Sequence, residues 1–310
     1  MTRLMAALAL VAAIDTAGAR PQPPGKDPAS LLLIDAVAFD RDGRTVADLS
    51  RDDLEVWIAG YRVPIEMLTA VTPANAAEEG RSIVLVLDDI TLEPPLVSRV
   101  RDIARRFVDR ILPGDEMAIV PLSGGTMEPS GDRARLLRAI DAYNARAIGV
   151  IPFDSLGQQV LTTVASISRQ LAQPSVRRKT IVGIGAAWLF DTPIPPPLVG
   201  RDLRPEWVDA MRAAALAPAS LYVIDPGGVG MLPVTSGTSG FARETGGHAF
   251  VNTNDVDGAA DRILREAGHY YLIGVADPPV QRKADLRELD VRSKRRGVTI
   301  RARRAIPGAS

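Results

Sequence analysis

The sequence has no cysteine, only two histidines and no excess of charge of either sign. The lack of cysteine excludes disulfides, thiolate zinc sites and cysteine nucleophiles. The 37 basic and 37 acidic residues give a formal net charge of zero. A general nucleic-acid binder normally carries an excess of positive charge, so we expect no nucleic-acid partner.

Long apolar runs are also missing. No stretch after the first residues approaches the ~20 consecutive apolar residues of a membrane-spanning helix, so we expect no membrane span in the mature chain. Yet 46% of the 310 residues are hydrophobic, which is ample for a full core. This length predicts one large domain or two smaller ones.

The first residues resemble a secretory signal peptide. Arg3 supplies a short positive region, an apolar run follows from Leu4 to Ile14, and Ala17-Gly18-Ala19 is a small-x-small cleavage pattern. Residues 20–29 form a Pro-rich linker. We therefore expect a cleaved signal peptide at residues 1–19 and a secreted or periplasmic protein. A disordered Ala-rich start or an uncleaved anchor is the alternative.

Three regions are expected after the linker. Residues 30–71 have the pattern of β-strands: LLLIDAVAFD, LEVWI and RVPIEML, the last two separated by a tight AGY turn. Residues 80–276 alternate buried strands with amphipathic helices, ending in the strand YYLIGVA. The alternation predicts an α/β fold with a doubly wound, mostly parallel sheet that has helices on both faces.

Residues 284–305 return to period-two alternation. LRELDVRSK and VTIRARR flank an Arg-Arg-Gly turn, which predicts a β-hairpin. A lone hairpin is unstable in water, so we expect it to pack on the N-terminal β region and form a small accessory β domain with it.

Four motifs occur in a characteristic order: FDRDGRTVADLSRDDLEVW, LPGDEMAIV, ARETGGHAFV, and HYYLIGV followed by the basic tail VTIRARRA. In this order they resemble a group of bacterial secreted proteins called VWFA-related domain proteins. The resemblance covers roughly residues 30–305. It implies a von Willebrand factor type A-like fold, which is Rossmann-like, and a protein-binding role without enzymatic chemistry, catalytic residues or a cofactor. The partner is not implied.

Type A domains often carry a metal-ion-dependent adhesion site with the pattern D-x-S-x-S, a later threonine and a last aspartate. Hard oxygen ligands of this kind suit Mg²⁺. In this chain the first aspartate corresponds to Asp88, but the two serines are replaced by Ile90 and Leu92. The threonine position falls near Asp154 or Ser155, and the last aspartate near Gly185 or Ala186. The resemblance therefore implies a degenerate site, and we expect no bound metal.

Two aspartates follow the apolar run IVLVL at the point where open α/β sheets place ligands. We expect Asp88 to accept hydrogen bonds from the loop at 89–93, and Asp89 to face solvent or a partner, since neighbours on an extended chain point to opposite faces. The expected contact surface is the loop rim at 88–95, 123–130, 150–156 and 186–204. The candidate ligand-binding residues on this rim are Asp88, Asp89, Thr91, Ser123, Asp154 and Ser155.

Two other interpretations stay open at this point. A metal-dependent hydrolase could use Asp88, Asp89 and Asp154, which requires the three carboxylates to converge in a closed pocket. A structural component of an envelope assembly would show a large apolar patch on one helical face.

The N-terminal pattern predicts cleavage after Ala19. Intact-mass measurement of protein recovered from the exported fraction should give a mature chain that starts at Arg20. Recovery of soluble protein that still starts at Met1 would contradict the prediction.

Overall fold

A computed structural model of the chain describes residues 31–73, 80–92, 94–145, 152–172, 178–188, 201–229, 236–277 and 286–308. The predicted signal peptide and Pro-rich linker lie outside the described residues. In the described part, no helix is both long and apolar enough to cross a membrane.

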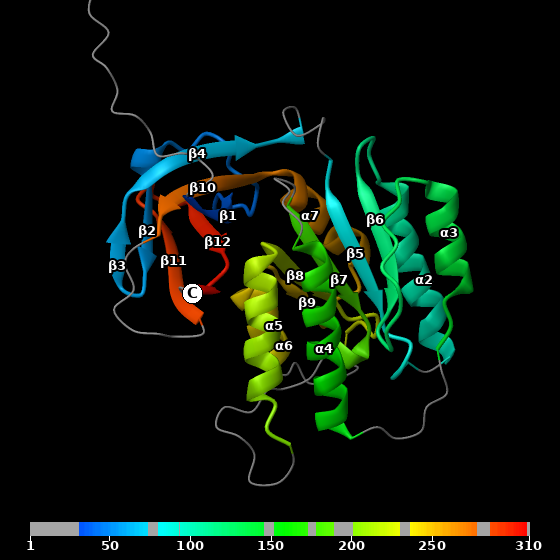
Figure 1. Cartoon of the computed structure of the whole chain (residues 1–310). Coiled ribbons are helices and arrows are strands. Elements are labelled where there is room, and N and C mark those ends of the chain that lie inside the picture. The colour runs from blue at the N-terminus through cyan, green and yellow to red at the C-terminus, as the bar shows by residue number, and fades with distance from the viewer. Residues whose placement is uncertain are drawn as a thin grey trace, which may run out of the picture.

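A five-stranded parallel sheet lies at the centre of the α/β part of the molecule (Figure 1). Its order is β6-β5-β7-β8-β9, and all neighbouring strands run parallel. The strands are β5 (Ser82–Leu87), β6 (Glu116–Pro121), β7 (Lys179–Ile184), β8 (Ala219–Ile224) and β9 (Ala249–Phe250). This sheet and the helices around it confirm the predicted α/β fold class.

Helices cover both faces of the parallel sheet. One face packs on α4 (Phe153–Leu171), α5 (Arg204–Leu216) and α6 (Ser236–Glu244), and the other on α2 (Pro94–Asp109), α3 (Arg133–Ala142) and α7 (Val256–Gly268). Two short 3-10 helices complete the described helices, η2 (Arg51–Asp53) and η3 (Ala186–Trp188). Asp132 caps α3 as predicted, since its carboxylate accepts hydrogen bonds from the backbone N–H groups of Ala134 and Arg135.

Both faces of strand β5 are apolar and buried. Ile83, Leu85 and Leu87 enter the core under α2, α3 and α7, whereas Val84 and Val86 enter the core under α4, α5 and α6. A strand buried on both faces carries a continuous apolar sequence, and the run that precedes the two aspartates is of this kind.

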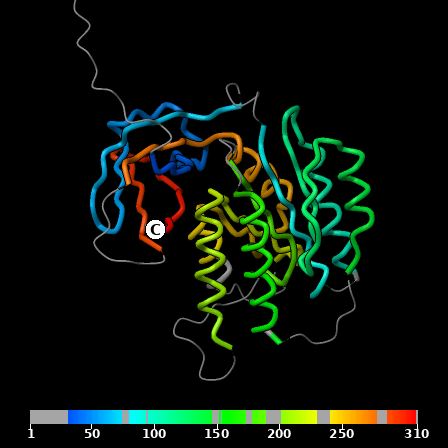
Figure 2. Tube along the Cα trace, in the orientation of Figure 1, coloured from blue at the N-terminus to red at the C-terminus, as the bar shows by residue number. Residues whose placement is uncertain are grey.

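Two antiparallel sheets form the β part of the molecule, with orders β12-β1-β10-β4 and β13-β11-β2-β3. They share one apolar core, to which β1, β10, β2 and β11 each contribute alternate residues. The strands are β1 (Leu31–Phe39), β2 (Leu54–Ile58), β3 (Tyr61–Val63), β4 (Ile65–Val71), β10 (Tyr270–Ala276), β11 (Leu286–Ser293), β12 (Thr299–Ala302) and β13 (Ala305–Pro307). Strands from the two ends of the described chain thus lie side by side, blue against red in Figure 2.

The expectation that YYLIGVA ends the parallel sheet is wrong. This segment is β10, and it pairs antiparallel with β1 on one side and β4 on the other. Its run of apolar residues fits any strand buried on both faces, so the sequence pattern does not distinguish the two sheets.

The predicted C-terminal hairpin is also partly wrong. β11 and β12 do pack on the N-terminal strands as expected, but β11 pairs with β2 and β12 pairs with β1, in different sheets. The segment RVPIEML is likewise divided into β3 and β4, which belong to different sheets. Pro64 separates them, because proline has no N–H to donate to a ladder.

A buried ion cluster joins the β part to the α/β part. Asp35 on β1 pairs through Oδ1 with Arg303 at 2.9 Å and through Oδ2 with Nε of Arg178 at 3.0 Å. All three side chains are almost fully buried. Burial alone would raise the pKa of Asp35, but the two guanidinium groups outweigh it and hold the pKa below its usual value.

The arginines extend the cluster to backbone atoms. Arg178 donates to the carbonyl of Glu266 at 2.5 Å, and Arg303 donates to the carbonyls of Ala214 and Ala215 at 3.2 Å. Arg178 precedes β7 and Arg303 follows β12, so the ion cluster connects both sheet systems. Loss of Asp35 would leave two buried cations without their carboxylate.

Asp35→Asn should therefore lower the free energy of unfolding by roughly 3–5 kcal/mol. Because the folded pKa is lowered, this stabilisation is complete above the unfolded value of about 3.9 and is lost as the pH falls through the folded pKa. Urea unfolding from pH 7 downward should show wild type and variant converging in acid. Asp48→Asn is the matched control, since Asp48 pairs with Arg295 at the exposed surface and should change stability little. Equal effects of the two substitutions would contradict the proposed importance of the ion cluster.

Candidate functional site

The candidate site lies where β5 ends. Both aspartates after β5 are buried, with 0% of Asp88 and 2% of Asp89 exposed. Buried carboxylates need hydrogen-bond donors, because removing a charge from water is costly. The donors therefore determine what each carboxylate can do.

The carboxylate of Asp88 accepts four hydrogen bonds from the chain itself. Oδ1 accepts from the backbone N–H groups of Ile90 at 3.0 Å and Thr91 at 2.9 Å. Oδ2 accepts from the Thr91 hydroxyl at 2.5 Å and from the backbone N–H of Ala187 at 2.7 Å. A carboxylate offers about four lone-pair sites, so these bonds use all of them. The prediction that Asp88 binds its following loop is confirmed.

The surroundings of Asp88 leave no space for another ligand on the side of β7. Gly185 has φ +152, and a Cβ at this position would lie 2.0 Å from Cβ of Asp88. Glycine is therefore required here for two reasons, its backbone conformation and its close approach to Asp88. The resemblance to type A domains places the missing distal aspartate near Gly185 or Ala186. The structure does bring this loop to Asp88, but the backbone N–H of Ala187 stands in place of a carboxylate.

Tyr143, after α3, holds the backbone of Asp88. Its hydroxyl donates to the carbonyl oxygen of Asp88 at 2.5 Å. Burial raises the pKa of Tyr143 well above its usual value, and the charges of Asp88 and Asp89 raise it further. The phenol thus stays protonated and keeps its hydrogen bond.

The expectation that Asp89 faces solvent or a partner is wrong. Its carboxylate accepts from the backbone N–H of Ser123 at 2.8 Å and from the Ser123 hydroxyl at 2.6 Å. Ser123 follows β6, the strand next to β5, so Asp89 joins the two neighbouring loops. Asp88 accepts from Ile90, Thr91 and Ala187, whereas Asp89 accepts from Ser123, consistent with neighbouring side chains that point to opposite sides.

The residues at the serine positions of the adhesion motif belong to the core. Ile90 is 8% exposed and packs in the core under α4 and α5, whereas Leu92 is 6% exposed and packs in the core under α2. These two side chains fix the loop from both sides of the sheet. Neither can coordinate a cation.

Asp154 and Ser155 do not join Asp88 and Asp89. Both lie in the first turn of α4, where Asp154 accepts from the backbone N–H of Ser155 at 2.8 Å and from that of Arg201 at 3.3 Å. Of the six candidate residues, the structure thus brings together Asp88 with Thr91, and Asp89 with Ser123. Within the described ranges, no three His, Cys, Asp or Glu side chains gather so that they could hold a metal ion.

Sequence reasoning missed three contributors at this edge of the sheet: Tyr143, the backbone N–H of Ala187, and Asp225. Asp225 directly follows β8, is 5% exposed and accepts from the backbone N–H of Gly227 at 2.8 Å. The pattern was available, because SLYVIDP ends in an aspartate as IVLVLDD does. Tyr143 and Ala187 give no such signal, since their contacts depend on loops far apart in sequence.

The set of donors and side chains around Asp88 does not fit the Mg²⁺ of a metal-ion-dependent adhesion site. Four intramolecular hydrogen bonds occupy its lone pairs, apolar side chains stand at both serine positions, and glycine stands near the distal carboxylate position. Mg²⁺ requires near-octahedral oxygen coordination. The arrangement instead uses a buried carboxylate as a structural acceptor that joins loops.

No protein-family model and no curated protein matches the sequence. The structure is similar to manganese-loaded TRAP protein of Plasmodium vivax, with 12% identity, a TM-score of 0.39 and coverage of 76% of this chain and 96% of that chain. It is also similar to the N-terminal domain of TFIIH p34, with 10% identity, a TM-score of 0.35 and coverage of 61% and 98%. At such low scores, the fold assignment depends on the strand order and register described above.

Asp88→Ala should lower the free energy of unfolding by roughly 3–5 kcal/mol, because two buried and two part-buried donors lose their acceptor. Millimolar Mg²⁺, Mn²⁺ or Ca²⁺ should leave the melting temperature of the wild type unchanged relative to a chelator. A metal bound to the folded state, at a hundredfold excess over its Kd, would instead raise the free energy of unfolding by about 2.7 kcal/mol.

Asp154→Ala is the matched control for this measurement. Its carboxylate is partly exposed, and the substitution should change stability by no more than about 0.5 kcal/mol. A rise in wild-type melting temperature with Mg²⁺ that Asp88→Ala abolishes would contradict the structural role of Asp88.

Proposed function

We propose that the chain is a secreted or periplasmic, non-catalytic binding module with a von Willebrand factor type A-like fold. Residues 80–276, apart from β10, supply the type A-like domain. Residues 30–71 with 284–305 supply the accessory β domain, to which we also assign β10 because it pairs with β1 and β4. The partner is a protein that contacts the loop rim at the carboxyl ends of the parallel strands.

The saturated carboxylate of Asp88 is the observation that carries this proposal. A catalytic carboxylate or a metal ligand must offer a lone pair to substrate or metal, and those of Asp88 are used within the chain. The hydrogen bonds of Asp88 and Asp89 fix the loops after β5, β6 and β7 in one arrangement. Rigid loops lose little entropy on binding, which favours a preorganised contact surface.

The exposed part of the rim has the composition of a polar contact surface. Gly124, Gly125 and Thr126 are exposed after β6, and Ser155 and Arg201 are exposed near the start of α4. These residues project from the loops that Asp88 and Asp89 fix or from their neighbours. Thr91, Ser123, Asp154 and Ser155 are proposed as partner-contacting residues, of which Asp88 positions Thr91 and Asp89 positions Ser123.

The other two interpretations find less support. A hydrolase that uses Asp88, Asp89 and Asp154 requires convergence of the three carboxylates, but Asp154 bonds to Ser155 and Arg201 instead. For a structural envelope component, the expected sign was a large apolar patch on one helix. In the described residues, the exposed large apolar side chains are dispersed over different elements: Tyr61, Leu112, Leu216 and Val229.

The rim hypothesis predicts that introducing positive charge at the exposed loops abolishes partner binding without unfolding the protein. The variant Thr126→Arg/Ser155→Arg should lose the proteins that the immobilised wild type retains from the native exported fraction. Arg138→Glu on the exposed face of α3 is the control and should retain them. Quantitative mass spectrometry of the retained proteins is the measurement, and identical sets for the rim variant and wild type would contradict the proposal.

A further inference from the structure

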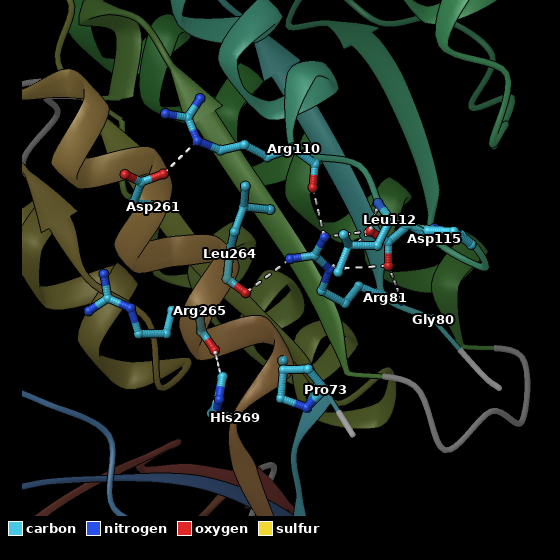
Figure 3. A pocket seen from close by; sticks show the side chains of 12 residues that line it. Pro73, Gly80, Arg81, Arg110, Leu112, Asp115, Asp261, Leu264, Arg265 and His269 are labelled. Atoms are coloured by element: carbon cyan, nitrogen blue, oxygen red, sulfur yellow. Dashed lines mark hydrogen bonds and ion pairs between the residues drawn. The ribbon is translucent and has the colours of Figure 1, made fainter. Parts of the chain in front are cut away.

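A pocket of about 370 Å³ lies at the opposite end of β5 from Asp88 (Figure 3). It forms where α2 and α7 end and where β5 and β6 begin. Its volume is in the lower part of the range of about 300–1,000 Å³ that is typical of small-molecule sites. The pocket is separate from the loop rim, so its function does not depend on the proposed function.

The pocket has a mainly apolar lining, to which Pro73, Leu112, Pro113 and Leu264 contribute. Leu112 is 52% exposed, although a leucine of this size normally gains from burial. A ligand with an apolar body would cover Leu112 and part of the other three side chains.

An ion pair between Arg81 and Asp115 closes one side of the pocket. Arg81 binds Asp115 through two nitrogens, with Nε–Oδ2 at 3.0 Å and a terminal nitrogen–Oδ2 distance of 2.5 Å. Its other donors reach the carbonyls of Leu264 at 3.2 Å and Arg110 at 3.1 Å. The Arg81 guanidinium is therefore satisfied within the chain, and its charge is cancelled by Asp115.

The remaining charged residues of the lining, Arg110, Asp261 and Arg265, leave one positive charge in excess. Arg110 pairs with Asp261 at 2.5 Å, as Figure 3 shows. Arg265 is exposed, and its guanidinium has no hydrogen-bond or ion-pair partner among the described residues. Nδ1 of His269, which lies below Arg265 in Figure 3, forms a hydrogen bond of 3.0 Å with the backbone carbonyl of Arg265. This bond fixes the imidazole at the pocket. With two ion pairs cancelled, one guanidinium is left to attract an anion.

We propose that this pocket binds a small organic monoanion, a carboxylate with an apolar aromatic or branched alkyl body. The body lies against Leu112, Leu264 and Pro73. The exposed side chain of Arg265, which Figure 3 draws directed away from Leu112 and Pro73, turns its guanidinium toward the carboxylate. The single guanidinium outside the ion pairs matches one negative charge on the ligand.

Gly268, the last residue of α7, provides a direct way to fill the pocket. A Cβ at Gly268 would lie 3.9 Å from Cδ of Arg81 and 3.9 Å from Cγ of Pro73, an ordinary van der Waals distance. Both neighbours line the pocket, so a larger side chain at position 268 enters it. Alanine fits here without displacing either neighbour.

The test uses 4-phenylbutanoate as the probe and its uncharged amide as the matched ligand, measured by isothermal titration calorimetry on the full mature chain. We expect one saturable site with a Kd of roughly 0.1–1 mM for the carboxylate. Gly268→Leu should abolish binding, whereas Gly268→Ala should keep it. Arg265→Gln should weaken the carboxylate roughly two- to fivefold and leave the amide unchanged.

Several results would overturn the proposal. They are the absence of saturable binding in the wild type, equal affinity of the wild type for carboxylate and amide, and undiminished binding to a folded Gly268→Leu variant. Circular dichroism establishes whether Gly268→Leu is folded. If it is not, Arg265→Gln decides, with Arg138→Gln on exposed α3 as the control that should bind like wild type.

Discussion

The hydrogen bonds accepted by Asp88 are the constraint on which the edge of the parallel sheet depends. One buried carboxylate receives donors from its own loop and from the loop after β7, and Tyr143 holds the backbone of the same residue. Gly185 must lack a side chain so that the loop after β7 can approach. Asp89 extends the connection to the loop after β6 through Ser123. Because each buried donor or acceptor is costly to leave unpaired, these contacts fix the loops together.

The same principle operates where the two parts of the molecule meet. Asp35 on β1 lies between Arg178 and Arg303, which come from opposite sides of the junction. A buried ion cluster of this kind adds little net stability compared with apolar packing, but its disruption is expensive. At this junction, as at the loops after β5, buried carboxylates hold segments that are distant in sequence.

Local patterns predicted much of the fold. The continuous apolar run before Asp88 indicated a strand buried on both faces, and Asp132 before an amphipathic segment indicated the start of α3. The hydrogen bonds of Asp88 to Ile90 and Thr91 were also predictable, since they join residues two or three positions apart.

Features that depend on distant partners were not predictable in this way. Asp89 is buried because Ser123, 34 positions later, supplies its donors. The tail strands β11 and β12 have the alternation of a hairpin, but their apolar faces pack on β2 and β1 in different sheets. For β10, the apolar run fits either sheet, and its pairing with β1 and β4 decides where it lies.

The central claim is that the carboxylates after β5 are structural acceptors and not metal ligands. The most direct measurement is a crystal structure of the wild type grown in millimolar MnCl₂, with anomalous diffraction data collected to locate manganese. The account predicts no anomalous peak within coordination distance of Asp88 or Asp89, and hydrogen bonds from Ile90, Thr91 and Ala187 to Asp88. A manganese peak bound to an Asp88 oxygen, with the Ala187 or Thr91 hydrogen bond broken, would contradict it.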